Sequence, residues 1–363
     1  MNKFREAFSR ILERCKTSEF LADIERLRNT FLGRDLVLYG AGELGSRTAK
    51  WLARNGIRAD FFCDRAKSGI HADTGLPIVS PQELSSGFNG ANILICSIAH
   101  ADSIRRDLLS LGIPKERIFL TEQLCIHDMT VEDFLPFVDG YEWAYHFFAD
   151  DASKAIILKR IEGYLLSSPL QSSAGVVYFD NEVLSLSSEE VFVDGGMFNG
   201  DTASEFIRCT DGKFGHYYGF EIDPENYRQA AENLIGLKRM TLTQKGLWSR
   251  ESELRIHANL ASSSKLSESG NDTALVTSLD AFFAKTTDKP TLIKLDIEGA
   301  EKEALLGAEN VIKSDKPRLA ICAYHKPEDI YVLPKLLAEY EVGYKFTLRH
   351  YSNTLLDTVL YAV

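Results

Sequence analysis

The chain has 363 residues, of which 45% are hydrophobic and 26% are charged. This length predicts two or three domains, and the composition is that of a folded protein rather than a disordered one. The 41 basic and 52 acidic side chains give a formal net charge of −11, which repels phosphate backbones and makes nucleic acid a poor default partner.

The start of the chain and its cysteines favour a cytoplasmic protein. Residues 1–10 contain no apolar core of signal-peptide length, and no run of about 18 apolar residues predicts a membrane span. The six cysteines form no Cys-x-x-Cys pair, which favours reduced thiols over a zinc site. Cys63, Cys96 and Cys322 lie within apolar runs, so we expect them to be buried.

The first third of the chain alternates between strand and helix patterns. Apolar residues at helical spacing predict two helices within residues 1–32, and a further helix is expected near residues 103–111. Short apolar runs predict strands at residues 36–39, 59–63, 91–98 and 117–120. Because strands that alternate with helices form parallel sheets, residues 33–125 are predicted to be a doubly wound, Rossmann-like domain.

A helical, aromatic-rich segment over residues 126–175 is predicted to connect this domain to a second one at residues 176–363. The second series of strands is expected at residues 191–193, 217–222, 242–247, 254–257, 291–295, 318–323, 344–348 and 358–362. The predicted fold class is therefore α/β, with two Rossmann-like doubly wound domains in series.

The first domain contains a glycine loop between a strand and a helix. Gly40, Gly42 and Gly45 have the spacing of a dinucleotide loop, and Asp64 ends the next strand. The helix N-terminus behind such a loop attracts a pyrophosphate. The alternative is that the glycines serve helix–strand packing alone. The region resembles the small nucleotide-binding domains of sugar-modifying enzymes.

A second glycine loop follows the strand at residues 191–193 and begins with Asp194. Its glycines let the main chain pass close under a ligand, which suits S-adenosylmethionine. Glu221 ends the next strand, where a carboxylate can accept hydrogen bonds from ribose hydroxyls.

At residues 192–196, 219–224, 293–301 and 323–326 the sequence resembles the FkbM family of S-adenosylmethionine-dependent methyltransferases. The resemblance implies a class I methyltransferase fold over residues 176–363, and many members have an acid where this chain has Asn199. The residues expected to bind the cofactor are Asp194, Gly195, Gly196, Gly200, Thr202, Glu221, Gly246, Leu247 and Asp296. Trp248 is expected either near the adenine or in the core.

Acidic side chains gather where the strand at residues 291–295 ends. Asp296 and Glu298 point the same way if the strand geometry persists, and Glu301 falls in the first turn of the next helix. The three carboxylates are candidate ligands for Mg²⁺. Helix capping and substrate hydrogen bonding are the alternatives.

His325 follows the strand at residues 318–323, again at a carboxyl end. An ordinary imidazole pKa near 6.5 suits a base that removes a hydroxyl proton, so we predict His325 as the catalytic base, with Asp296 and Glu298 as catalytic partners. Lys326, Arg349 and Tyr351 are the predicted substrate contacts.

The sequence thus predicts an O-methyltransferase that uses S-adenosylmethionine and acts on a hydroxyl of a sugar or glycoconjugate. One alternative is a nucleotide-sugar-binding or NAD-dependent enzyme whose chemistry lies in the first domain. Another is a non-catalytic adaptor that binds the cofactor only to stabilise a partner interface.

Overall fold

The computed structural model describes residues 2–88, 90–97, 100–121, 129–257, 265–266 and 272–363. The chain divides into two compact units. Unit 1 comprises Met1–Val138, Leu158–Leu170 and Asn353–Leu355, and unit 2 comprises Asp139–Ile157, Gln171–Ser352 and Leu356–Val363. The domain boundaries predicted at residues 125 and 175 remain predictions, and residue 125 lies outside the described residues.

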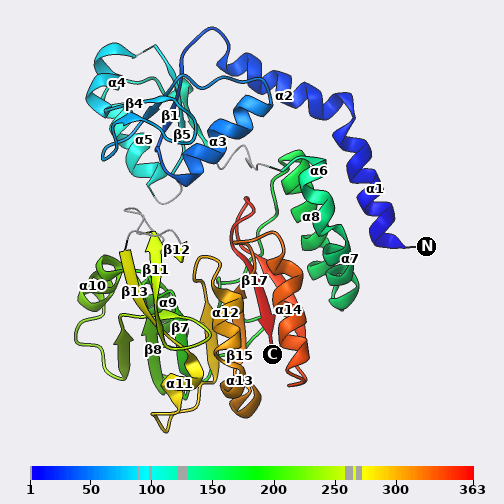
Figure 1. The fold of residues 1–363 in the computed structure, drawn as a ribbon, viewed down its shortest axis with the longest axis vertical. Helices are drawn as coiled ribbons and strands as arrows, with labels where there is room; N and C mark the ends of the chain where they lie inside the picture. The colour runs from blue at the N-terminus through cyan, green and yellow to red at the C-terminus, as the bar shows by residue number, and fades with distance from the viewer. Residues whose placement is uncertain (1, 89, 98–99, 122–128, 258–264, 267–271) are drawn as a thin grey trace. The chain divides into compact units, whose positions relative to one another are not determined.

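Unit 1 contains a six-stranded sheet in the order β3-β4-β2-β1-β5-β6 (Figure 1). Its strands are β1 (Leu36–Tyr39), β2 (Phe61–Cys63), β3 (Gly69–Ile70), β4 (Pro77–Val79), β5 (Asn92–Ile95) and β6 (Ile118–Leu120). Neighbouring strands are parallel except at β3, which pairs antiparallel with β4. The parallel α/β prediction for this region is therefore confirmed.

Alternating side chains of β1 bury both faces of this sheet. Leu36 and Leu38 belong to one hydrophobic cluster, and Val37 and Tyr39 belong to another. The strands are connected by the helices α3 (Glu43–Arg54), α4 (Pro81–Gly87) and α5 (Ala101–Ser110) and by the 3-10 turn η1 (Lys115–Arg117). Continuous apolar strands are typical of a sheet with helices on both faces.

The remaining helices of unit 1 pack through aromatic side chains. They are α1 (Lys3–Cys15), α2 (Ser18–Phe31), α6 (Val131–Phe134), η3 (Leu135–Phe137) and the part of α8 (Asp151–Leu166) that begins at Leu158. The ring of Phe134 lies 6.3 Å from that of Phe8 and 5.7 Å from that of Tyr164. These contacts join α6 to α1 and α8.

Unit 2 is built on a seven-stranded sheet in the order β16-β17-β15-β14-β7-β8-β9. Its strands are β7 (Val191–Gly195), β8 (His216–Phe220), β9 (Met240–Thr243), β14 (Leu292–Leu295), β15 (Arg318–Cys322), β16 (Phe346–His350) and β17 (Thr358–Ala362). β17 runs antiparallel to both of its neighbours, and the other neighbouring pairs are parallel. The helices of the unit are α7 (Val138–Phe147), α9 (Asp201–Cys209), α10 (Pro224–Asn233), α11 (Leu279–Phe283), α12 (Glu301–Leu306), α13 (Glu309–Asp315) and α14 (Asp329–Glu339).

A separate four-stranded sheet in unit 2 differs from the prediction. It has the order β10-β13-β11-β12, with β10 (Gly246–Leu247), β11 (Ser252–His257), β12 (Lys265–Leu266) and β13 (Asp272–Thr277). Residues 246–247 and 254–257 are therefore not strands of the doubly wound series, and β13 was not predicted. The sequence of β11 gives the physical reason. Glu253 and Arg255 alternate with apolar residues, and this pattern is typical of an antiparallel sheet with one polar face.

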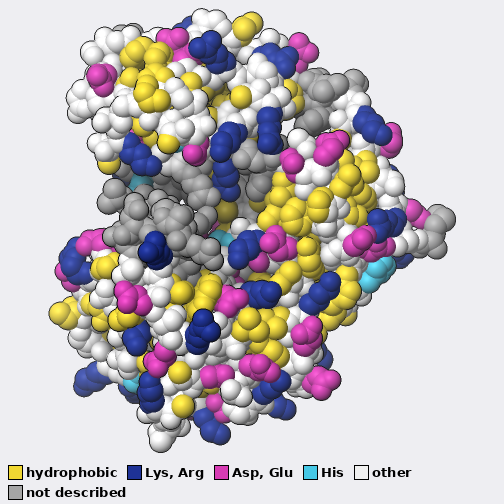
Figure 2. Space-filling view, viewed as in Figure 1, with side chains coloured by type: hydrophobic (Ala, Val, Ile, Leu, Met, Phe, Trp, Pro, Cys, Tyr) yellow, Lys and Arg dark blue, Asp and Glu magenta, His cyan; other side chains and the backbone are white. Residues whose placement is uncertain are grey.

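Within the described residues, no helix combines the length and the apolar character needed to cross a membrane. Five described cysteines are free thiols, and Cys63, Cys96 and Cys322 are buried as predicted. Acidic and basic side chains are interspersed on the face of the molecule in Figure 2.

Candidate active site

The candidate site of unit 2 is formed where β7, β8, β14 and β15 end. These four strands are parallel neighbours, so their carboxyl ends lie at one edge of the sheet. Ligands of open α/β sheets bind at this edge. The predicted site residues that follow the four strands are therefore brought together by the topology.

A buried ion pair underlies the glycine loop that follows β7. The ammonium of Lys294 lies 2.9 Å from Asp194 Oδ1 and donates to the carbonyl oxygens of Gly195 and Gly196 at 3.2 and 2.7 Å. The hydroxyl of Tyr217 donates to Asp194 Oδ2 at 2.8 Å. Burial opposes the charge on Lys294, but Asp194 and Asp296 raise its pKa above the usual value. Asp194 therefore holds Lys294 and, through it, the loop.

The loop turns at glycines that no other residue could replace without strain. Gly196 has a φ of +76°, and a Cβ there would lie 1.9 Å from the carbonyl oxygen of Asp296. Gly200 has a φ of +87° and is the N-cap of α9; Thr202 lies in the first turn of that helix. Gly196 therefore lets the loop run directly against the segment that follows β14.

Glu221, which follows β8, is buried and binds two loops. Its Oε2 accepts a hydrogen bond from the backbone N–H of Phe198 at 2.9 Å, and its Oε1 accepts one from that of Asp223 at 2.8 Å. Burial raises the pKa of Glu221 to about 7, although these two hydrogen bonds lower it. The carboxyl group is thus held at the edge of the sheet beside the glycine loop.

Gly246 and Leu247, two further residues predicted to bind the cofactor, form β10. A Cβ on Gly246 would lie 2.8 Å from Ile222 Cδ1, and one on Gly195 would lie 2.8 Å from Leu247 Cδ1. Leu247 is buried and Trp248 is partly buried. Gly195 therefore lies against Leu247, and Gly246 lies against Ile222, the residue that follows Glu221.

Three acidic residues follow β14. Asp296 accepts hydrogen bonds from the hydroxyls of Tyr178 at 2.8 Å and Tyr324 at 3.2 Å. Glu298 has a φ of +56°, so strand alternation does not extend to it. Glu301 Oε1 accepts from the backbone N–H of Ile297 at 2.9 Å. This oxygen of Glu301 therefore holds the turn between β14 and α12; it does not cap α12, whose N-terminus has no side-chain cap hydrogen bond.

His325 follows β15 and touches all three acids. Its Nε2 lies 3.4 Å from Asp296 Oδ1 and 3.7 Å from Glu298 Oε2, and its Nδ1 lies 3.0 Å from Glu301 Oε1. Burial lowers the pKa of His325, but Glu301, Asp296 and Glu298 together raise it to about 9. The site thus contains a cluster of one imidazole and three carboxylates.

Ligand atoms from Asp296, Glu301 and His325 all lie within 4.8 Å of one another. Glu298 is not in this group, although it was one of the three carboxylates predicted as Mg²⁺ ligands. The geometry therefore offers two carboxylates and an imidazole rather than three carboxylates.

The three predicted substrate contacts, Lys326, Arg349 and Tyr351, have different partners in the structure. Lys326 Nζ donates to the carbonyl oxygen of Gly299 at 2.5 Å, beside the cluster. Arg349 pairs with Asp150 at 3.1 Å. The Tyr351 hydroxyl donates to Asp180 at 2.8 Å. Only Lys326 of the three has its polar group among the residues that follow β14.

Sequence reasoning did not single out Tyr178, Tyr324 or Asp357 as site residues. The two tyrosines hydrogen-bond to Asp296, and burial together with Asp296 raises the pKa of Asp357 to about 6. Tyr324 could have been found from its position next to His325. The segments around Tyr178 and Asp357 carry no spacing that points to the site.

In unit 1 two glycines of the first glycine loop lie against backbone atoms. A Cβ on Gly40 would lie 2.7 Å from the carbonyl oxygen of Cys96, and one on Gly45 would lie 2.0 Å from that of Gly40, whereas the described atoms leave open space around Gly42. Asp64 accepts hydrogen bonds from the backbone N–H groups of Ala41, Ala66 and Lys67. The geometry agrees with the packing alternative, and nucleotide binding here remains a prediction.

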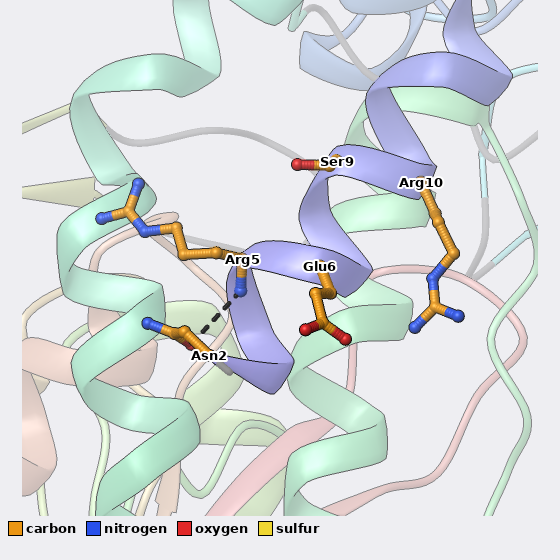
Figure 3. Close-up of a pocket in the computed structure, with 5 residues that line it drawn as sticks. All are labelled: Asn2, Arg5, Glu6, Ser9 and Arg10. Atoms are coloured by element: carbon orange, nitrogen blue, oxygen red, sulfur yellow. Dashed lines mark hydrogen bonds between the residues drawn. The ribbon is translucent and has the colours of Figure 1, made fainter.

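A hollow on helix α1 lies far along the chain from these motifs. It is lined by Asn2, Arg5, Glu6, Ser9 and Arg10. Figure 3 shows the hydrogen bond from the Arg5 backbone N–H to the side chain of Asn2. None of the predicted site residues lines this hollow.

Comparison with known proteins gives one family. Residues 194–346 match the Methyltransferase FkbM domain, and no curated protein matches the chain. The chain is similar to the crystal structure of Methyltransferase FkbM from Methylobacillus flagellatus KT, with 21% identity over 99% of both chains and a TM-score of 0.64. At that identity the likeness bears on the fold alone.

Two further similar structures match about half of the chain. One is an rRNA methylase from Streptococcus thermophilus, with 16% identity, a TM-score of 0.30, and coverage of 49% of this chain and 87% of the other. The second is Aeropyrum pernix fibrillarin in complex with S-adenosyl-L-methionine, with 13% identity, a TM-score of 0.33, and coverage of 50% and 70%.

Proposed function

We propose that this chain, whose residues 194–346 match the Methyltransferase FkbM domain, transfers a methyl group from S-adenosylmethionine to a hydroxyl of a sugar or glycoconjugate. The observation that carries the proposal is the close approach of Gly196 to Asp296, which joins the glycine loop to the acid and histidine cluster. A cofactor loop and a proton-accepting cluster are the two parts that such a transfer needs.

The residues around the glycine loop fit the proposed cofactor. Each oxygen of Glu221 accepts one backbone hydrogen bond, and a carboxylate oxygen has a further lone pair for a ribose hydroxyl. Gly196 and Gly200 leave the loop without a side chain at these two positions. The acidic cluster beside the loop complements a cationic sulfonium. Bound S-adenosylmethionine supplies an activated methyl group, so the protein has to orient the acceptor and remove its proton.

The cluster of Asp296, Glu298 and His325 supports the second task. The side chains of Glu298 and Asp296 are 36% and 25% exposed, whereas that of His325 is 7% exposed. An acceptor hydroxyl would therefore meet a carboxylate before it meets the imidazole. We assign the hydroxyl proton to the cluster as a unit, and the role of His325 as the base itself remains a prediction.

Sugar hydroxyls suit these groups. Carboxylates accept hydrogen bonds from neighbouring hydroxyls, and Lys326 can donate to ring or hydroxyl oxygens. The net charge of −11 disfavours a phosphate-rich acceptor such as nucleic acid.

The test is calorimetric titration of the full chain with S-adenosylmethionine, S-adenosylhomocysteine and NAD, followed by transfer of labelled methyl to a panel of glycans. Binding of the sulfur compounds and transfer to a hydroxyl support the proposal. Binding of NAD alone would favour the first-domain alternative. Cofactor binding without transfer to any acceptor would favour a non-catalytic adaptor.

A further inference from the structure

The imidazole of His325 is buried within its cluster of three carboxylates. Its side chain is 7% exposed, and neither ring nitrogen has a hydrogen-bond partner in the part of the chain that the structure describes. Nδ1 lies 3.0 Å from Glu301 Oε1 as an ion pair, but it forms no hydrogen bond with the described residues. Buried polar groups in folded proteins are normally paired, so this ring calls for an explanation.

The same is true of Glu301. Its side chain is 1% exposed. Oε1 accepts the backbone N–H of Ile297, whereas Oε2 is buried without a hydrogen-bond partner among the described residues. Glu301 Oε2 and the imidazole of His325 therefore both lack a hydrogen-bond partner among the described residues, within the same cluster.

We propose that Asp296, Glu301 and His325 bind a divalent transition-metal cation of the Mn²⁺ or Zn²⁺ class. One ligand atom from each residue lies within 4.8 Å of the others. Ligands about 2.1 Å from a cation are at most about 4.2 Å apart, so small side-chain movements close the site. A mixed nitrogen and oxygen donor set favours a transition metal, because Mg²⁺ and Ca²⁺ prefer oxygen ligands.

The surroundings favour a cation. Glu298 Oε2 lies 3.7 Å from His325 Nε2 and can approach as a further ligand. The buried carboxyl of Asp329 accepts the backbone N–H of Lys326 at 2.8 Å, next to His325. The buried ammonium of Lys294 in the same unit is paired with Asp194. Acidic groups therefore outnumber basic ones around His325.

The metal site itself does not depend on the proposed function. Only its consequence rests on that function: the cation would lie where the acceptor hydroxyl loses its proton. Binding itself can be measured without turnover. A parent chain that binds the metal but transfers no methyl group would contradict the proposed function and still support the metal site.

The experiment titrates Mn²⁺ into the full chain after treatment with a chelator and follows free Mn²⁺ by electron paramagnetic resonance. We expect one bound ion per chain, with affinity lowered about tenfold or more in Glu301→Gln and Asp296→Asn. Glu190→Gln is the matched control, because Glu190 is equally buried in the same unit but pairs with Arg318; it should bind Mn²⁺ like the parent chain.

Pulsed electron paramagnetic resonance of the parent chain with Mn²⁺ provides a readout that needs no variant to fold. Coupling of the bound ion to an imidazole nitrogen in the parent chain supports the site, and a folded His325→Gln chain should lack this coupling. Absence of stoichiometric binding, absence of nitrogen coupling, or equal affinity in a folded Glu301→Gln chain would overturn it.

Discussion

The ammonium of Lys294 and the carboxylate of Asp194 form a fully buried ion pair at 2.9 Å, beneath the loop that we assign to the cofactor. The pair joins neighbouring strands, since Lys294 of β14 is opposite Asp194 of β7 in the sheet register. Lys294 also holds two loop carbonyl oxygens. The pair therefore couples the stability of the sheet to the shape of the loop.

Lys294→Met should destabilise the protein by about 3 to 5 kcal/mol, because it leaves the carboxylate of Asp194 buried without its cation. Unfolding in urea, followed by circular dichroism, measures the change. The double variant Asp194→Asn with Lys294→Met should be more stable than the single Lys294→Met variant, since neither of the two positions then carries a charge. A Lys294→Met chain as stable as the parent would show that the pair contributes little.

Gly196→Ala should cost about 3 kcal/mol or more of folding free energy, because its Cβ would lie 1.9 Å from the carbonyl oxygen of Asp296. Gly212→Ala is the matched control. Gly212 has a similar φ of +70°, but its Cβ would meet no described atom within 4 Å, so the left-handed backbone alone should cost about 1 to 2 kcal/mol.

Thermal unfolding of both variants measures the difference. Equal losses of stability in Gly196→Ala and Gly212→Ala would mean that the loop does not approach Asp296 as closely as described. A larger loss in Gly196→Ala should be accompanied by loss of cofactor binding, because the loop and the cluster would move apart.

Particular residues explain how much of this arrangement was predictable. Strand β1 was predicted with its exact bounds because all four of its residues are apolar and both faces of the sheet are covered. Asp296 and His325 were predicted to share an edge because parallel strands place their carboxyl ends together. Both predictions use local patterns and one rule of topology.

Other features depend on contacts that no local pattern encodes. Tyr178 reaches Asp296 from 118 positions away and comes from a segment without strand or helix periodicity. The prediction that Glu298 aligns with Asp296 required the strand to continue, but β14 ends at Leu295 and Glu298 has a left-handed φ. Tertiary contacts decide both cases.

The stability of the chain should fall as the pH rises through about 7, because of Glu221. Burial raises its pKa from an ordinary value of 4.5 to about 7, against the hydrogen bonds from the backbone N–H groups of Asp223 and Phe198, which lower it. The folded state therefore keeps a proton that the unfolded state has already lost, so the stabilisation present below pH 4.5 disappears by about pH 7. Glu221→Gln removes this contribution.

Unfolding free energies at pH 5 and pH 8 check the sign. The parent chain should lose stability relative to Glu221→Gln between these values, and a difference that stays constant would contradict the raised pKa. Affinity for S-adenosylhomocysteine should change in the opposite direction, rising with pH in the parent chain, because the ionised carboxylate is the better acceptor for ribose hydroxyls.

Tyr178→Phe should lower kcat about tenfold or more and leave cofactor affinity unchanged. The variant removes the hydroxyl that donates to Asp296 Oδ2 at 2.8 Å, and hydrogen bonds to charged groups are worth about 1.5 to 3 kcal/mol. Tyr178 acts as a positioning residue, since it holds the carboxylate that faces the acceptor.

Tyr218→Phe is the matched control, because its hydroxyl donates to Asp288 at 2.6 Å in the same unit but away from the cluster. Kinetics with saturating cofactor should give a reduced kcat only for Tyr178→Phe; an equal effect in both variants would point to general destabilisation, and no effect in either would remove Tyr178 from the reaction.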